Sequence, residues 1–356
     1  MKIIGIDFFC GCGGVSYGFK RAGINMLMGI DNDLSVKIPY ELNNTPAKFI
    51  NADILDTDYN AKIVKEALKS VHYDHSIFAA CAPCQPFSSQ NKKYSEDDRK
   101  SLLMNFYEVI ARLDKAYLPT FIFFENVGPM KLRGKKILEK ILDKLSNLNY
   151  SYLSPKVLNA ADFGVPQSRK RLIILAVNDK KIKINWLKYS WDYFYSNYSE
   201  RHKTVKEAIG HLPPIKAGTT HISDSLHTSR KLSDLNLKRL RQITQPGGSR
   251  DMWRREDRLK CHENYKGHKD VYGRMAWDKP APTLTTKCLG ISNGRFGHPV
   301  QDRAISLREA AILQSMEKFK FGNNLSNEKI ARMIGNAVPP LLAKKFAQFI
   351  IELLEE

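Results

Sequence analysis

The chain has 356 residues, of which 43% are hydrophobic and 26% charged, and this composition excludes a protein that is mainly disordered. No apolar run approaches the roughly 20 residues that a membrane span needs, and the N-terminal stretch lacks the features of a signal peptide, so we expect a cytoplasmic protein. Six cysteines are too few for a disulfide scaffold. The excess of 56 Lys and Arg over 37 Asp and Glu, a net charge of +19, favours a polyanionic partner.

Short apolar runs alternate with helical patterns from the N-terminus to about residue 177. Runs that end at turn residues or acids predict strands at Lys2–Asp7, Met26–Asp31, Phe49–Asp53, Ser76–Cys81, Phe121–Glu125 and Arg171–Val177. Helical spacing predicts helices at Val15–Ala22, Leu34–Leu42, Asn60–Ser70, Arg99–Ala116 and Lys135–Asn147. This alternation favours an α/β fold with a doubly wound, Rossmann-like, mostly parallel sheet.

Beyond residue 180 the pattern changes. Residues 180–300 are polar, basic and aromatic, with Pro and Gly breakers and no sustained period, which predicts a smaller, irregular second domain. Helical spacing returns at Ser306–Gln314, Asn327–Ile334 and Leu341–Leu354. We therefore expect one domain formed by residues 1–180 and 325–356, and a second formed by residues 181–324.

Basic residues gather between Thr228 and Lys260. This segment holds ten basic and four acidic residues, a net +6, where the chain average predicts about +2. Trp253 and His262 lie among them. A merely solvated basic face is the alternative, but the clustering favours a surface that binds nucleic acid.

A glycine-rich turn follows the first predicted strand, in the segment Asp7–Gly14. A doubly wound sheet binds nucleotides at this place, although Ser16 stands where a dinucleotide fingerprint needs glycine, which favours a cofactor without a pyrophosphate. Asp31 ends the next strand, where it can accept hydrogen bonds from ribose hydroxyls, and Asp53 ends the third, where it can accept from an adenine amino group. A purely structural turn is the alternative.

Two further segments carry candidate chemistry. Cys84 follows a buried strand and lies between two prolines that restrict the backbone, so we expect its thiol at the carboxyl end of the sheet, as suits a nucleophile. A zinc site built from Cys10, Cys12, Cys81 and Cys84 is the less favoured alternative, because Cys-x-Cys is not a usual ligand pair. Glu125 ends a strongly apolar strand, where poor solvation suits it to sharing a proton with a substrate nitrogen; a surface acid is its alternative.

Taken together, the motifs resemble the ordered set of the DNA (cytosine-5)-methyltransferase family. They occur in the family's order over almost the whole chain except residues 180–270: Asp7–Gly14, Pro83–Ser88, Glu125–Val127, Gln167–Arg171, Arg303–Gln314 and Gly335–Pro340. Any one of these motifs would be a weak signal, and their order makes the resemblance specific. The departures are Ala82, where proline is frequent, and Asn32, where some members carry an aromatic ring.

The resemblance implies a role for each matching residue. Cys84 attacks C6 of cytosine, Glu125 engages N3 and the exocyclic amine, and Arg171 with Arg169 binds O2 of the base and flanking groups. The methyl donor is S-adenosylmethionine, and no metal is expected. The positions that match cofactor-binding residues of the family are Phe8, Gly11, Gly13, Asp31, Asp53, Leu102 and Asn336. The last helix is expected to return to the first domain.

The resulting prediction is a compact bacterial or phage enzyme that methylates a flipped-out cytosine in double-stranded DNA. The second domain then recognises the target, and the protein is expected to be a cytoplasmic, nucleoid-associated monomer, with a companion restriction endonuclease as a further expected partner. Methylation of tRNA, performed by a branch of the same family, is the nearest alternative. A non-catalytic DNA-binding modulator and a nucleotide-dependent oxidoreductase are the alternatives from other classes.

Overall fold

A computed structural model describes residues 1–83, 102–262 and 270–355 of the chain. The chain divides into two compact units, the first formed by 1–159, 170–199 and 338–356 and the second by 160–169 and 200–337. The expected boundaries at 180/181 and 324/325 differ from these units. Residues 181–199, which include α7 (Trp191–Tyr198), belong to the first unit, and residues 325–337, which include α11 (Asn327–Asn336), belong to the second. No helix within the described ranges is long and apolar enough to span a membrane.

The first unit is a seven-stranded sheet with the strand order β3-β2-β1-β4-β5-β7-β6. Strands β1 to β5 are parallel, whereas β7 is antiparallel to both β5 and β6. The strands are β1 (Ile3–Phe8), β2 (Asn25–Asp31), β3 (Lys48–Asn51), β4 (His75–Ala80), β5 (Phe121–Val127), β6 (Tyr150–Asn159) and β7 (Lys170–Asn178). The predicted α/β class is confirmed, with β6 as an additional strand.

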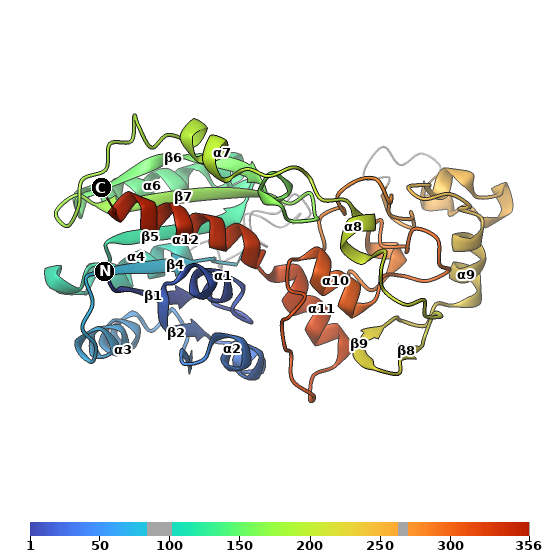
Figure 1. Ribbon diagram of the computed structural model, residues 1–356, viewed down its shortest axis with the longest axis horizontal. Helices are drawn as coiled ribbons and strands as arrows, with labels where there is room; N and C mark the ends of the chain where they lie inside the picture. The colour runs from blue at the N-terminus through green and yellow to red at the C-terminus, as the bar shows by residue number, and fades with distance from the viewer. Residues whose placement is uncertain (84–101, 263–269, 356) are drawn as a thin grey trace. The chain divides into compact units, whose positions relative to one another are not determined.

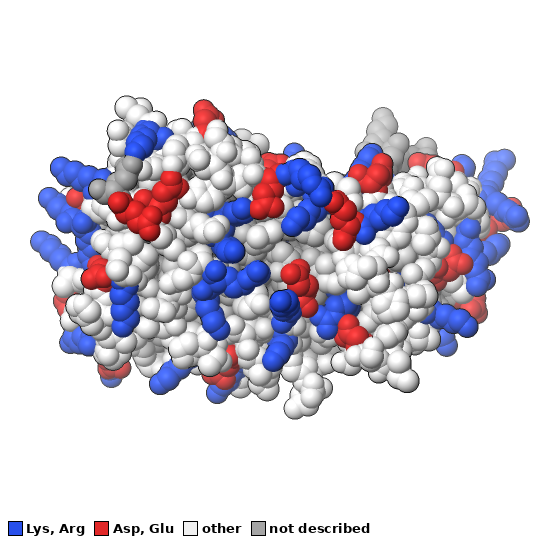
Figure 2. Space-filling model, viewed as in Figure 1, with Lys and Arg blue, Asp and Glu red and all other residues white. Residues whose placement is uncertain are grey.

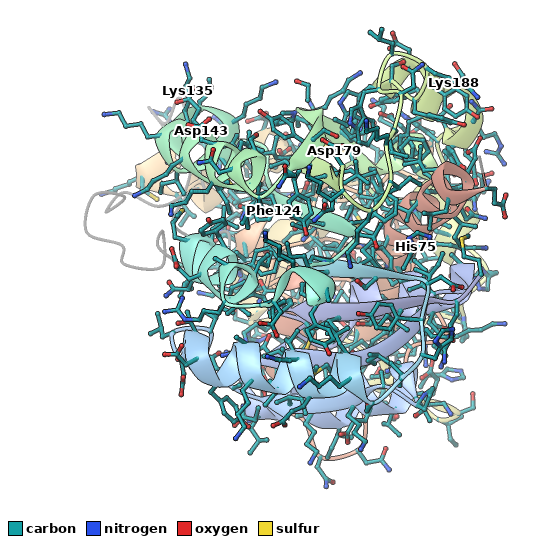
Figure 3. The ribbon with its side chains drawn as sticks, turned by 90° about the vertical axis from the view of Figure 1, so that its left-hand side faces the viewer. His75, Phe124, Lys135, Asp143, Asp179 and Lys188 are labelled. Carbon is teal, nitrogen blue, oxygen red and sulfur yellow. The ribbon has the colours of Figure 1, made fainter. Side chains whose placement is uncertain are left out.

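Helices cover both faces of this sheet, as Figure 1 and the edge-on view in Figure 3 show. They are α1 (Gly14–Ala22), α2 (Lys37–Asn44), α3 (Thr57–Lys69), α4 (Leu102–Ala111), α5 (Met130–Arg133), α6 (Lys135–Asn147), α7 (Trp191–Tyr198) and α12 (Pro340–Leu354). Successive side chains of a strand point to opposite faces of the sheet, so neighbouring residues of β5 pack against different helices. Phe124 packs in the cluster that includes α3, α4 and α6. Phe123 contacts Phe19 of α1 and Phe346 of α12.

The C-terminal helix α12 lies against α1, as the expected return to the first domain requires (Figure 1). The approach is close at Gly18, where an added Cβ would overlap the carbonyl oxygen of Pro340 and the Cβ of Ala343. Only glycine leaves enough room for the two helices at this crossing. Residues at opposite ends of the chain thus form one face of the first unit.

The second unit has little regular structure. It contains α8 (Val205–Ile209), β8 (Thr220–His221), β9 (Asp224–Thr228), α9 (Asp234–Arg241), α10 (Leu307–Leu313) and α11 (Asn327–Asn336), with short 3-10 turns between α9 and α10. Its apolar cluster includes Leu240, Ile243, Trp253 and Ile291. The sequence pattern missed α8, α9 and the β8–β9 hairpin, because elements this short give too few residues to establish a period.

Candidate active site

The carboxyl ends of β1 and β2 form the predicted nucleotide turn. After β1 the chain passes through residues with positive φ, 57° at Phe9, 50° at Gly11 and 89° at Gly13, before α1 begins. The glycines allow this left-handed path. Asp31, at the end of β2, accepts a 2.9 Å hydrogen bond from the Gly11 backbone N–H. The acid at the end of β2 therefore fixes the turn that follows the neighbouring strand β1.

Asp31 is placed to bind further donors. Its second oxygen accepts a 2.9 Å bond from the backbone N–H of Asp33, and burial raises the pKa of its carboxyl. A carboxylate has about four lone-pair sites, and these two bonds leave room for hydroxyl donors. Asp53 is exposed and follows β3 by two residues, rather than ending it; its carboxylate accepts from the backbone N–H of Leu55 at 3.0 Å and faces the Asn32 amide at 3.4 Å.

Asp7 has a different position from the one that the sequence predicted, at the end of the first strand. Its buried carboxylate accepts bonds from the Ser16 backbone N–H at 3.2 Å and the Ser16 hydroxyl at 2.7 Å, and Ser16 in turn contacts the hydroxyl of Tyr40. Burial raises the pKa of Asp7 to about 7. Asp7 therefore anchors the first turn of α1 and stabilises the preceding glycine turn from its buried side.

The other residues expected at the cofactor fall into three environments. Phe8 is completely buried and packs between Phe78 and Phe106, with ring centroids at 5.6 and 5.0 Å, so its ring is a core residue and a contact with the cofactor is not expected of it. The next residue, Phe9, is half-buried at the turn itself and is the better candidate. Leu102 is half-buried at the start of α4, and Asn336 is exposed at the end of α11 in the second unit.

Glu125 and Arg171 form the candidate catalytic pair. Both are nearly buried, with 7% and 8% of each residue exposed, and the Arg171 Nε lies 2.8 Å from a Glu125 carboxylate oxygen. In the antiparallel register Glu125 faces Ile173, so Arg171 is its diagonal neighbour, within reach of a long side chain. The sequence predicted that both residues act at the base, but it did not predict that they bind each other.

Asn126 connects this pair to the strand that leads to Cys84. Its buried amide donates a 3.2 Å hydrogen bond to the carbonyl oxygen of Ala82, just after β4. Cys84 itself lies outside the described residues. Cys81, three residues earlier, is described, and burial raises the pKa of the Cys81 thiol well above its ordinary value, as is typical of an inert thiol.

Arg169 lies two residues before Arg171 but belongs to the second unit. Its guanidinium is buried and donates to the carbonyl oxygens of Leu284 at 3.1 Å and Gly335 at 2.8 Å. These bonds hold three distant segments of the second unit together. A direct contact of Arg169 with the base stays a prediction.

The basic segment 228–260 lies in the second unit, where Figure 2 shows Lys and Arg side chains over α9 and the turns that follow it. Arg254, Arg255 and Lys260 are exposed and form no ion pair with any described residue. Trp253 was expected on this surface, but it is 3% exposed and packs against Tyr272, so it belongs to the core. The His262 side chain lies outside the described residues.

The zinc alternative finds no support within residues 1–83, 102–262 and 270–355, where no three His, Cys, Asp or Glu side chains form a metal-binding group. Cys10 and Cys12 are buried, and burial raises the pKa of Cys12 to about 12. A thiol whose pKa is raised in this way is a poor nucleophile.

The sheet, the glycine turn and Asp31 at the end of β2 define an α/β protein of the Rossmann-like class, with its candidate site at the carboxyl ends of the parallel strands. The model of the C-5 cytosine-specific DNA methylase family matches residues 3–352. The chain belongs to this family and is a cytosine-5 DNA methyltransferase. Enzymes of this kind use S-adenosylmethionine as the methyl donor.

Curated relatives and solved structures agree with this family. The type II methylase M.HgiDII of Herpetosiphon aurantiacus is 38% identical over 98% of this chain and 95% of its own length. The type II methyltransferase M1.HphI of Haemophilus parahaemolyticus is 29% identical over 99% of this chain and 88% of its own. A putative DNA modification methyltransferase from an Escherichia coli prophage has the same fold, with a TM-score of 0.75 at 22% identity over all of both chains. The Dnmt2 methyltransferase of Schizosaccharomyces pombe has a TM-score of 0.64 at 18% identity over 100% of this chain and 99% of its own.

Proposed function

We propose that this enzyme methylates C5 of a cytosine that is flipped out of a specific sequence of double-stranded DNA, through a covalent bond between Cys84 and C6. The observation that carries the proposal is the buried Glu125–Arg171 pair at the end of β5, which the Asn126 amide connects to the backbone before Cys84. A thiol, a carboxylate and a guanidinium are the groups that nucleophilic attack on a pyrimidine requires.

Each group has a distinct part in this chemistry. The Cys84 thiolate forms a bond to C6, and the electron pair of the C5–C6 double bond becomes available at C5. Glu125 donates to or accepts from N3 and the exocyclic amine, and Arg171 both orients Glu125 and offers its remaining N–H groups to O2 of the base. After methyl transfer, loss of the C5 proton restores the double bond as Cys84 is expelled.

The first unit is suited to S-adenosylmethionine. Asp31 is held beside the left-handed turn from Phe9 to Gly13 by its bond from the Gly11 N–H, and it offers its remaining lone pairs to the ribose hydroxyls. Phe9, Leu102 and Asp53 are proposed to surround the adenine, and Asn336 stays a predicted cofactor contact. The bound cofactor supplies an electrophilic methyl group.

The target is proposed to be duplex DNA, because a relative that is 38% identical is a type II methylase and the second unit exposes a basic surface. A cytosine stacked within a duplex cannot be reached by a protein thiol, so the base must be extruded. The second unit would contact phosphates and read the target sequence. The enzyme is proposed to act as a monomer, with a companion restriction endonuclease as its partner in the cell.

Methyl transfer from radiolabelled S-adenosylmethionine tests the substrate class. We expect incorporation into duplex DNA that contains the recognised sequence, at C5 of cytosine, and none into tRNA. A library of duplexes followed by bisulfite sequencing identifies the site. Incorporation into tRNA in place of DNA would contradict the proposal and assign the protein to the RNA-modifying branch.

Salt dependence tests the basic surface. Each phosphate contact contributes about 0.9 to the slope of log K against log salt for duplex DNA, so replacing Arg254 and Arg255 by Gln should lower the slope by about 2. The matched control replaces Lys136 and Lys140, which are exposed on α6 of the first unit, and should leave the slope unchanged. Equal slopes for both double variants would show that Arg254 and Arg255 do not contact the DNA.

A further inference from the structure

Arg250 differs from the other buried arginines of the second unit. Five arginines there are less than 9% exposed: Arg169, Arg239, Arg250, Arg274 and Arg303. The guanidinium groups of the other four all donate hydrogen bonds. Arg303 forms a two-fold ion pair with Glu309, and Arg274 donates to several carbonyl oxygens and to Asp302. Arg239 donates to the Asp257 carbonyl, and Arg169 donates through both terminal nitrogens to the carbonyls of Leu284 and Gly335.

The Arg250 guanidinium has no such partner. The residue is 7% exposed, its Nη1 is buried without an acceptor, and no oxygen of the described residues accepts a hydrogen bond from its guanidinium or pairs with its charge. The adjacent Asp251 carboxylate is instead bonded to the Ser249 hydroxyl at 2.9 Å. Burying a guanidinium without a partner is costly for a folded chain, so the arrangement indicates an acceptor that binds from outside.

A second unpaired donor lies three residues further along. The indole Nε1 of Trp253 is also buried and has no acceptor among the described residues, although the Trp253 ring is held by Tyr272 and by the Arg239 guanidinium 5.0 Å above it. The same short segment exposes Arg254 and Arg255. Residues 250–255 therefore combine two buried donors that lack acceptors among the described residues with two exposed cations, a composition that suits a ligand that is anionic and rich in acceptor oxygens.

We propose that Arg250 binds a phosphate of the DNA backbone and so fixes the position of the second unit on its target, an inference that rests on the proposed function. Arg has the planar fork that binds phosphate oxygens through two bonds. A phosphate is favoured over a base edge because Arg250 is almost completely buried. Contact with a base in the groove needs a side chain that extends from the surface, whereas phosphates are the outermost groups of the duplex.

The test combines thermal stability with DNA affinity in the full-length protein. Arg250→Met removes a buried charge that has no partner, so the midpoint of thermal unfolding should stay the same or rise. Affinity for the duplex should fall about 10- to 100-fold, the effect of losing hydrogen bonds to a charged group, and the salt slope should fall by about 1. Arg250→Lys, which keeps the charge, should retain part of the affinity.

Arg303→Met is the matched stability control, because it breaks a buried ion pair and should lower the unfolding midpoint. If Arg250→Met lowers the midpoint as much as Arg303→Met, Arg250 has a structural role and the proposal is wrong. A loss of affinity confined to some target sequences would assign Arg250 to a base and also overturn the phosphate contact. If the wild type binds duplex DNA and Arg250→Met binds it equally well, the proposed role of Arg250 is wrong and the proposed function stands. If the wild type itself does not bind duplex DNA, the proposed function is wrong.

Discussion

Replacing Cys84 by Ala should lower the rate of methyl transfer by at least about 10⁴-fold, the size of effect seen when a catalytic nucleophile is removed. Binding of S-adenosylmethionine and of DNA should persist, because neither requires the sulfur atom. Single-turnover methylation of the recognised duplex measures the rate, and equilibrium binding measures both affinities.

Cys81 provides a matched control for this substitution. It lies three residues before Cys84, and burial together with the nearby charge of Glu125 raises the pKa of its thiol, so it remains protonated and cannot serve as the nucleophile. Cys81→Ala should keep methylation within about tenfold of the wild type, because the attacking thiolate is still present. DNA with 5-fluorocytosine at the target should trap the wild type and Cys81→Ala covalently, since fluorine cannot leave as the proton does. Appreciable turnover or trapping by Cys84→Ala would refute the assignment.

Substitution of Glu125 should separate catalysis from stability. Glu125→Gln keeps an oxygen that can accept from Arg171 Nε but loses the charge, so the rate should fall by about 10²- to 10³-fold, as when one electrostatic contact to the transition state is removed. Glu125→Ala should lose at least as much activity. It should also lose about 3–5 kcal/mol of unfolding free energy, because the Arg171 guanidinium then stays buried without its carboxylate.

Single-turnover rates and urea unfolding of both variants distinguish the two effects. The expected result is that the two variants differ clearly in stability and little in activity. If Glu125→Gln retained the wild-type rate, Glu125 would be only the structural partner of Arg171. If Glu125→Ala unfolded at the same urea concentration as Glu125→Gln, the ion pair would contribute nothing measurable to the fold.

Much of the fold follows from local sequence. The predicted strands lie within a few residues of the observed ones, and α1, α2, α3, α4, α6 and α12 match predicted helices, because an apolar run of a few residues and a 3.6-residue period are local properties of the chain. The predicted helix Arg99–Ala116 begins outside the described residues, and α5 and α7 were not predicted. The direction of β7 is not local, since an apolar run has the same pattern whether its strand is parallel or antiparallel. Strand β6 was missed because it is only partly buried and contains Ser154, Pro155 and Lys156.

In the candidate site too, some properties follow from the local sequence and others depend on the tertiary structure. The order of the motifs predicted the family and implied the proposed roles of Cys84, Glu125, Arg171 and Asp31, since each role depends on residue type and position along the chain. Only the tertiary structure decided which of these residues bind each other. It pairs Glu125 with Arg171 across two strands, and it turns the carboxylate of Asp7 towards α1.

Burial also depended on the tertiary structure. Phe8 and Phe9 are adjacent and identical in type, yet one is in the core and the other lies at the turn, because the strand ends between them. Arg250 and Arg254 belong to one basic segment, but the first is buried without an acceptor among the described residues and the second is exposed. Sequence determined the elements and the chemical groups because these depend on near neighbours; burial and pairing depend on segments distant in the chain, which only the folded protein brings together.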